Sequence, residues 1–236
     1  MIGLSIGLTF SVSLVVAPMI ADIIGVPGLF MLTGILTVIS IGVVAWMTPD
    51  PEVSKLHEDT QAQPSRMGEV LRDRQLLNLD FGIFALHAAQ MALFTALPFA
   101  MTQLGLEKIQ HWKVYLPSTI AGLVIMIPLI IIGETRNKLK QIFILGIACI
   151  AAAQIGLLFG MHSIWLITAY LVVYFIGFNV LEASLPSMVS KIAPSDLKGT
   201  AMGVYNTMQS VGLFVGGASG GWLFQQYGFA GVFTFC

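Results

Sequence analysis

The chain has 236 residues, of which 56% are hydrophobic and only 10% are charged, and its formal net charge is −1 at pH 7. Soluble domains carry about 25% charged residues, so this composition excludes an ordinary water-soluble domain and indicates a surface that faces lipid. The nearly balanced charge gives no indication of a nucleic-acid partner. Both cysteines, Cys149 and Cys236, lie in apolar sequence, and neither belongs to a metal-ligand pattern.

Long apolar runs follow one another along most of the chain, and a run of about 20 residues is long enough to cross a bilayer as an α-helix. We predict seven complete spans and the beginning of an eighth. They cover approximately residues 1–21, 29–47, 77–101, 114–133, 141–160, 164–190 and 199–224, and the eighth begins near Gly228. The runs lack the alternation of membrane strands. The predicted fold class is therefore all-α, a polytopic membrane helical bundle.

The polar stretch over residues 48–76 separates the second span from the third and begins a pattern of basic loops. Nine of the eleven lysines and arginines lie in this stretch and in the loops 134–140 and 191–198, whereas the intervening loops carry only Lys108 and Lys113. Cytoplasmic loops of membrane proteins carry the excess of positive charge. The strict alternation therefore predicts that residues 48–76 are cytoplasmic, and it independently supports the number of spans.

The seventh span contains the most specific motif. Gly212, Gly216 and Gly220 recur at every fourth residue, so they share one face of a helix. The full pattern is Gly203, Gly212, Gly216, Gly217, Gly220 and Gly221. Small residues on one face let two helices approach closely in lipid, so the motif predicts a packing seam. Gln209 lies close to the same face and is expected to hydrogen-bond across that contact.

The first span carries a degraded copy of this motif, with Pro18 at the position of Gly217. Each of these two spans is followed by a helix opening of the form G-x-x-G-x-F, at residues 25–30 and 228–233. Two similar hairpins separated by six spans suggest parallel six-helix repeats, an architecture in which transporters place the substrate site between the halves. The predicted parts are two helices of an N-terminal half (1–47), a cytoplasmic central loop (48–76) and a six-helix C-terminal half, truncated in its last helix (77–236).

The pattern over residues 203–221 resembles the antiporter motif of the major facilitator superfamily, with Gly217 where that motif has proline. Residues 182–187 and 198–205 are similar to bacterial drug:proton antiporters, and with residues 111–116 they resemble the YajR-like branch. The resemblance covers the whole chain, which corresponds to spans five to twelve of a twelve-span fold. It implies that four helices precede Met1, that a complete cavity needs them, and that this sequence is a fragment.

The function that this resemblance implies is secondary active transport, in which small lipophilic compounds leave the cell in exchange for protons by alternating access. The implied location is the bacterial inner membrane, and the implied partners are a small-molecule substrate, protons and the lipid bilayer. The alternatives are an uptake symporter of the same fold and a truncated, non-transporting membrane protein. No cofactor, metal ion or enzymatic activity is expected, because the sequence has neither a catalytic constellation nor a phosphate-binding loop.

Glu182 lies inside the sixth span, about 12 Å from its cytoplasmic end, where a charge is expected to face the bundle or water. Two roles are open for it. Glu182 either pairs with Lys138 or Lys140 and latches the cytoplasmic side, as acidic residues near this loop do in the family, or it carries the coupling proton. The depth of Glu182 favours the latch. Glu134 and Lys138, four residues apart, resemble a second-half counterpart of the family's signature loop.

Polar residues of other spans extend the candidate site. Asp80, His87 and Met91 share one face of the third span, and this face is a candidate cavity lining. His87 is either a proton relay, since histidine titrates near neutral pH, or an interhelical hydrogen-bonding residue. Asp80 either lines the cavity or lies at the level of the lipid headgroups. The complete candidate lining is Asp80, His87, Gln90, Met91, Asn179 and Asn206.

Overall fold

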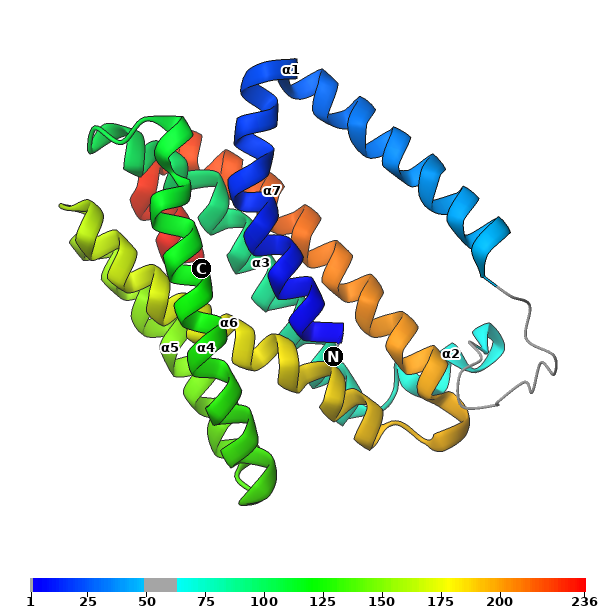
Figure 1. Ribbon diagram of the computed structural model, residues 1–236. Helices are drawn as coiled ribbons and strands as arrows, with labels where there is room; N and C mark the ends of the chain where they lie inside the picture. Colours follow the sequence, from blue (N-terminus) through cyan, green and yellow to red (C-terminus); the bar gives the residue numbers. More distant parts are fainter. Residues whose placement is uncertain (1, 49–62) are drawn as a thin grey trace.

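The computed structural model describes residues 2–48 and 63–236, and this part of the chain is helical, without a β-strand. Figure 1 shows a bundle of long helices joined by short turns. The elements are α1 (Ile2–Met47), η2 (Pro64–Arg66), α2 (Met67–Val70), α3 (Arg74–Gln103), η3 (Lys108–Gln110), α4 (Trp112–Thr135), α5 (Leu139–Gly160), α6 (Ile164–Ile192), η4 (Ser195–Leu197) and α7 (Lys198–Phe235). The predicted all-α class is confirmed.

Two of these elements, α1 and α7, are each a pair of helices joined at a glycine. Gly25 in α1 has φ 72° and Gly228 in α7 has φ 62°, in the left-handed region that glycine adopts without a steric penalty. These are the first glycines of the two G-x-x-G-x-F openings. The two hairpins therefore share a backbone feature as well as a sequence pattern. In Figure 1 the two arms of α1 diverge from this turn.

The helix boundaries agree with the predicted spans once α1 and α7 are divided at these glycines. Five helices are long and apolar enough to cross a membrane: Val16–Met47, Arg74–Gln103, Lys108–Thr135, Leu139–Gly160 and Ile164–Ile192. The described helix α7 does not meet that hydropathy criterion, because glycine, glutamine and serine lower its average. Its 38 residues are nevertheless long enough to span.

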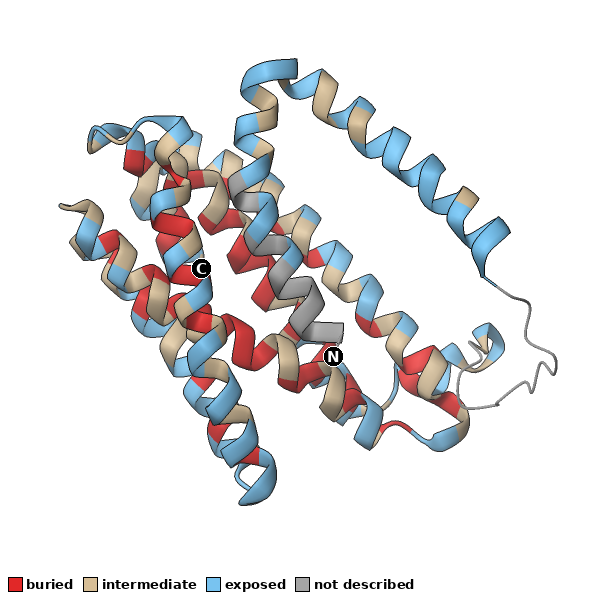
Figure 2. Cartoon of the chain, in the orientation of Figure 1, coloured by how far each residue is buried: buried red, intermediate tan, exposed pale blue. Residues whose placement is uncertain are grey.

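The outer surface of the bundle is apolar. Large hydrophobic side chains such as Trp46, Phe159, Trp165 and Phe214 are exposed. Figure 2 shows that exposed residues cover most of the second arm of α1 and the outer sides of α4 and α5. Soluble monomers rarely expose apolar surface on this scale, so this surface is the one that contacts lipid.

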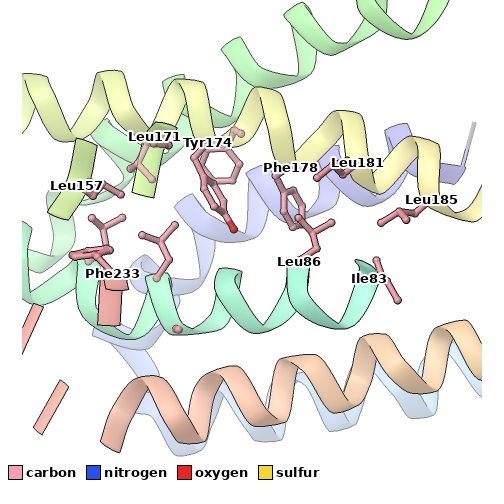
Figure 3. Close-up of a cluster of buried hydrophobic side chains, with 14 of the residues drawn as sticks. Ile83, Leu86, Leu157, Leu171, Tyr174, Phe178, Leu181, Leu185 and Phe233 are labelled. Atoms are coloured by element: carbon pink, nitrogen blue, oxygen red, sulfur yellow. The ribbon is translucent and has the colours of Figure 1, made fainter. Parts of the chain in front are cut away.

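The hydrophobic core lies mainly between α3 and α6. In Figure 3, Ile83 and Leu86 of α3 lie opposite Phe178, Leu181 and Leu185 of α6. The interior of the bundle is closely packed at this contact, and α3 contributes more buried residues than any other described helix. On another side α3 packs extensively against α7, and α6 contacts α3, α4, α5 and α7.

The contact between α3 and α7 is the predicted glycine seam. Gly212, Gly216 and Gly220 are all buried. A Cβ atom on Gly216 would collide with the carbonyl oxygen of Ala88 in α3. A Cβ atom on Gly220 would lie 2.7 Å from the Cα atom of Ala92, well inside van der Waals contact. The two backbones therefore touch directly, which only glycine permits at these positions.

The remaining glycines of the motif do not belong to this seam. A Cβ atom on Gly203, Gly217 or Gly221 would meet no atom within 4 Å among the described residues. Of the six glycines that form the sequence pattern, only the buried ones recurring at every fourth residue are needed for helix packing.

This difference provides a matched pair of substitutions. We expect Gly216→Ala to destabilise the protein by about 1–3 kcal/mol, because the new methyl group forces α3 and α7 apart. Gly217→Ala should be neutral or stabilising by up to about 1 kcal/mol, because alanine is the better helix former. Thermal unfolding in detergent micelles measures both, and equal effects of the two substitutions would contradict the seam.

The segment that precedes α3 is fastened to the turn between α6 and α7. Arg66 forms a bidentate ion pair with Glu69, at 2.7 and 2.8 Å, and a second ion pair with Asp196, at 2.5 Å. The backbone N–H of Gln63 donates to the hydroxyl oxygen of Thr200 at 2.8 Å. The guanidinium of Arg66 lowers the pKa of both carboxyl groups below their ordinary values.

The lowered pKa values predict how this attachment depends on pH. A carboxylate with a depressed folded-state pKa stabilises the folded contact above its ordinary pKa of about 4 and loses that contribution as pH falls further. The attachment should therefore persist from neutral pH to about pH 4 and weaken below it. Hydrogen exchange at the Gln63 amide, corrected for the intrinsic rate, reports this. Asp196→Asn should weaken protection already at neutral pH, and unchanged protection would contradict the role of the ion pair.

Candidate functional site

Three polar side chains from three different helices meet inside the bundle. They are His87 of α3, Glu182 of α6 and Gln209 of α7. The Gln209 amide nitrogen lies 2.8 Å from Nε2 of His87 and 3.5 Å from Oε1 of Glu182. Nε2 of His87 lies 3.7 Å from Oε2 of Glu182. His87 is 4% exposed, so these contacts form largely away from the bundle surface.

The hydrogen bonds define the tautomer of His87 in this arrangement. An amide N–H of Gln209 can only donate, so Nε2 of His87 accepts. The other ring nitrogen, Nδ1, then carries the proton and donates to the carbonyl oxygen of Ile83 at 3.2 Å. The imidazole is neutral in this state. Glu182 and His87 are thus two neighbouring groups that can each accept a proton.

The surroundings of this cluster are apolar. The ring of Phe178 contacts the His87 ring edge-to-face, with centroids 5.7 Å apart. Figure 3 shows Phe178 projecting from α6 towards α3 at this level. In such surroundings a change in the charge of Glu182 or His87 has a large electrostatic effect on its neighbours, because little water screens it.

The structure bears on the two roles predicted for His87 and on the two positions predicted for Asp80. His87 is the interhelical hydrogen-bonding residue, and it also touches a carboxylate, so the geometry is compatible with a relay. Asp80 is only 2% exposed, so it is buried in the bundle. Its position relative to the lipid headgroups stays a prediction, and it lies six residues after the start of α3.

The predicted latch between Glu182 and Lys138 is absent from this structure. Glu182 contacts His87 and Gln209 instead. Lys138 is exposed in the turn between α4 and α5. Glu134 forms its ion pair with Lys191 at the end of α6, at 3.8 Å, and not with Lys138.

The other candidates for the cavity lining fall in different places. Gln90 and Asn179 are buried, Met91 is half-buried, and Asn206 is exposed. Two cavities of about 430 and 490 Å³ lie against α3. None of the six predicted lining residues borders either of them. The first is lined by the neighbouring face of α3, including Phe81 and Ala85, together with α5 and α6, and the second includes Pro18.

One residue beside the site was missed from the sequence. Phe178 of α6 contacts the ring of His87. It lies four residues before Glu182, and this spacing, which places both on one face of α6, is the signal that could have found it. Among the described residues, no group of three or more His, Cys, Asp or Glu side chains has the arrangement of a metal site.

Two buried glutamines make a further prediction possible. Gln209→Leu removes the donor to His87, and we expect a loss of about 0.6–2 kcal/mol in stability. Gln154 of α5 is buried, and its side-chain amide has no hydrogen-bond partner in the described part of the chain. Gln154→Leu should therefore be neutral or stabilising. Thermal unfolding in detergent compares the two, and a larger loss for Gln154→Leu would contradict the assigned contacts.

The fold and the site together define a polytopic helical membrane protein with proton-accepting groups inside its bundle, a class typical of secondary transporters. The chain belongs to the Major Facilitator Superfamily, whose family model matches residues 1–217. This confirms the family that the glycine motif and the neighbouring segments had indicated.

Comparison with curated proteins agrees. The chain is 36% identical over 232 residues to the inner membrane transport protein YajR of Escherichia coli (strain K12), which covers 98% of this chain and 51% of YajR. It is 25% identical over 195 residues to the multidrug resistance protein MdtH of Cronobacter sakazakii, covering 81% of this chain and 46% of MdtH. An uncharacterized transporter of Buchnera aphidicola is 26% identical over 216 residues, covering 91% of this chain and 55% of that protein.

The chain thus spans about half the length of the curated relatives that it matches. The similarity to YajR confirms the branch predicted from the sequence. With the family and the apolar helices, it also supports the predicted location: the chain is a multi-pass protein of a bacterial inner membrane.

Proposed function

We propose that the gene product containing this chain is a secondary transporter that exports small lipophilic compounds in exchange for protons. The observation that carries this proposal is the contact of Glu182 with His87 and Gln209. An ionisable residue at this depth costs about 2.5–3.5 kcal/mol on insertion scales. Ionisable residues inside membrane spans typically mark transport pathways. A carboxylate beside an imidazole is suited to binding and releasing a proton.

The coupling follows from how the three helices share this site. When Glu182 is ionised, its charge favours the N–H of the Gln209 amide that faces it, so α6 and α7 are held together while the same amide also bonds His87 of α3. When Glu182 binds a proton and becomes neutral, the charge-assisted part of its hydrogen bond with Gln209 is lost. Each change of charge therefore alters the relative stability of helix arrangements, which is the requirement for linking proton binding to alternating access.

The proposal of a lipophilic substrate is supported by two independent observations. The cavity of about 430 Å³ between α3, α5 and α6 is lined almost entirely by apolar side chains, and its volume falls in the range of small-molecule sites. The relative MdtH is named a multidrug resistance protein. An apolar lining selects weakly among compounds, which suits export of chemically varied molecules.

The test uses the gene product containing this chain in inverted membrane vesicles that are acidic inside. A lipophilic dye such as ethidium should cause proton release, seen as recovery of the fluorescence of a pH-sensitive amine dye. Glu182→Gln should abolish this release, because glutamine cannot carry a proton. Exchange of labelled for unlabelled substrate without a proton gradient should continue.

Glu107→Gln is the matched control, because Glu107 is an exposed carboxylate in the turn between α3 and α4 and does not belong to the candidate site. It should leave proton release close to the wild-type level. Full proton-driven transport by Glu182→Gln would overturn the proposal. Movement of substrate and protons in the same direction would identify an uptake symporter instead, and no substrate movement by the unaltered protein would identify a non-transporting one.

A further inference from the structure

Three cations in the turn between α4 and α5 have no counter-charge within the part of the chain that the structure describes. Arg136, Lys138 and Lys140 are close in the sequence, and all three are exposed. Among the described residues, none of them belongs to an ion pair. The acidic residue nearest to them in the sequence is Glu134, which is paired with Lys191 of α6 at 3.8 Å. Its charge is therefore already balanced.

Other turns that the structure describes do not carry such an excess of positive charge. In the segments before α3 and between α6 and α7, which lie on the same predicted cytoplasmic side, Arg66 is paired with both Glu69 and Asp196. The turn between α3 and α4, on the opposite side, carries one acidic and one basic residue, Glu107 and Lys108. Among the described turns, the one between α4 and α5 therefore has the largest unbalanced positive charge.

The backbone of this turn is compact. The N–H of Lys138 donates to the carbonyl oxygen of Gly133 at 2.8 Å, and Asn137 adopts a left-handed conformation with φ 52°, which asparagine tolerates better than most residues. Consecutive Cα atoms are about 3.8 Å apart, so the Cα atom of Lys138 lies within about 7.6 Å of those of Arg136 and Lys140. Their long side chains can therefore contact the same anionic group.

Apolar surface begins directly beside these charges. Ile131 and Ile132 near the end of α4, and Ile144 and Leu145 near the start of α5, are exposed. Figure 2 shows that exposed residues continue along the outer sides of α4 and α5 to the turn that joins them. Because this apolar surface contacts lipid acyl chains, a basic turn at its end lies at the level of the lipid headgroups. Lysine and arginine are suited to this level, since their stems pack on apolar surface while their charges stay in water.

We propose that the turn between α4 and α5 binds an anionic phospholipid of the cytoplasmic leaflet. Arg136, Lys138 and Lys140 contact its negatively charged headgroup, and its acyl chains lie against the exposed side chains of Ile132 and Ile144. A zwitterionic lipid binds more weakly, because its own ammonium group balances its phosphate. Each basic residue near an anionic membrane surface strengthens binding about fivefold. This inference concerns a different surface from the candidate site and does not rest on the proposed transport activity.

Arginine and lysine bind a phosphate group differently. The planar guanidinium of Arg136 can donate two parallel hydrogen bonds to phosphate oxygens, whereas the ammonium groups of Lys138 and Lys140 act as point charges. Arg136→Gln should weaken binding of the lipid about fivefold, because it removes one charge. Arg136→Lys should weaken it less, because the charge remains and only the bidentate geometry is lost. A greater loss with Arg136→Lys than with Arg136→Gln would contradict the role of charge.

The main experiment measures lipid affinity by native mass spectrometry of the gene product containing this chain in mild detergent. The unaltered protein should bind phosphatidylglycerol about tenfold or more tightly than phosphatidylcholine. Lys138→Gln/Lys140→Gln should lower the affinity for phosphatidylglycerol about tenfold or more and leave that for phosphatidylcholine within about twofold. The matched control is Lys108→Gln/Lys113→Gln, which removes two exposed lysines from the opposite side of the membrane. It should leave both affinities within about twofold of the unaltered protein.

Two further measurements separate lipid binding from an effect on folding. Neither Lys138 nor Lys140 forms an ion pair among the described residues, so thermal unfolding in detergent without added lipid should be the same for both double variants. In the unaltered protein, raising ammonium acetate from about 0.1 M to about 0.5 M should weaken binding of phosphatidylglycerol severalfold, because salt screens the attraction. Binding that salt leaves unchanged would overturn the electrostatic basis of the site without any substitution.

The remaining outcomes test the position of the site and the identity of its ligand. Equal affinity of the two double variants for phosphatidylglycerol would overturn the assignment to the turn between α4 and α5. Equal binding of phosphatidylglycerol and phosphatidylcholine by the unaltered protein would overturn the preference for an anionic headgroup. Displacement of phosphatidylglycerol by inorganic phosphate at the same concentration would identify a site for free phosphate, and the lipid assignment would be wrong.

Discussion

The direct backbone contact between α3 and α7 is the constraint on which the rest of the C-terminal half depends. Because Gly212, Gly216 and Gly220 have no side chains, the two helices approach until their backbones touch. This closeness places the Gln209 amide within hydrogen-bond distance of His87. A wider separation would leave both polar groups unpaired in an apolar bundle. The glycine seam is therefore both the main packing element and the support of the candidate site.

The same arrangement explains why polar groups persist in a lipid-facing protein. Helices satisfy their own backbones in a membrane, so side chains are free to serve other purposes, and each buried polar atom lowers stability unless it is paired. His87 and Gln209 are paired, whereas one oxygen each of Asp80 and Glu182 and the hydroxyl of Tyr205 are not, within the part of the chain that the structure describes.

The glycines at the turns within α1 and α7 reflect a repeated architecture in this chain. Gly25 and Gly228 adopt the same left-handed conformation at corresponding places in two similar hairpins, as expected of repeated units. The attachment of Gln63 and Arg66 to the turn before α7 adds a connection on the other side of the bundle. Through it, the described end of the central loop contacts the turn between α6 and α7, the helices that carry Glu182 and Gln209.

The sequence by itself determined the helical class, the span boundaries, the glycine seam and the family, because each depends on local periodicity or on the demand of lipid for apolar, internally bonded segments. Gln209 was found for the same reason, since it lies beside the seam. The tertiary structure alone decided that Glu182 meets His87 and not Lys138, that Asn206 is exposed, and that Phe178 packs against His87. These outcomes depend on how each helix is rotated about its axis, and only packing against distant helices fixes that rotation.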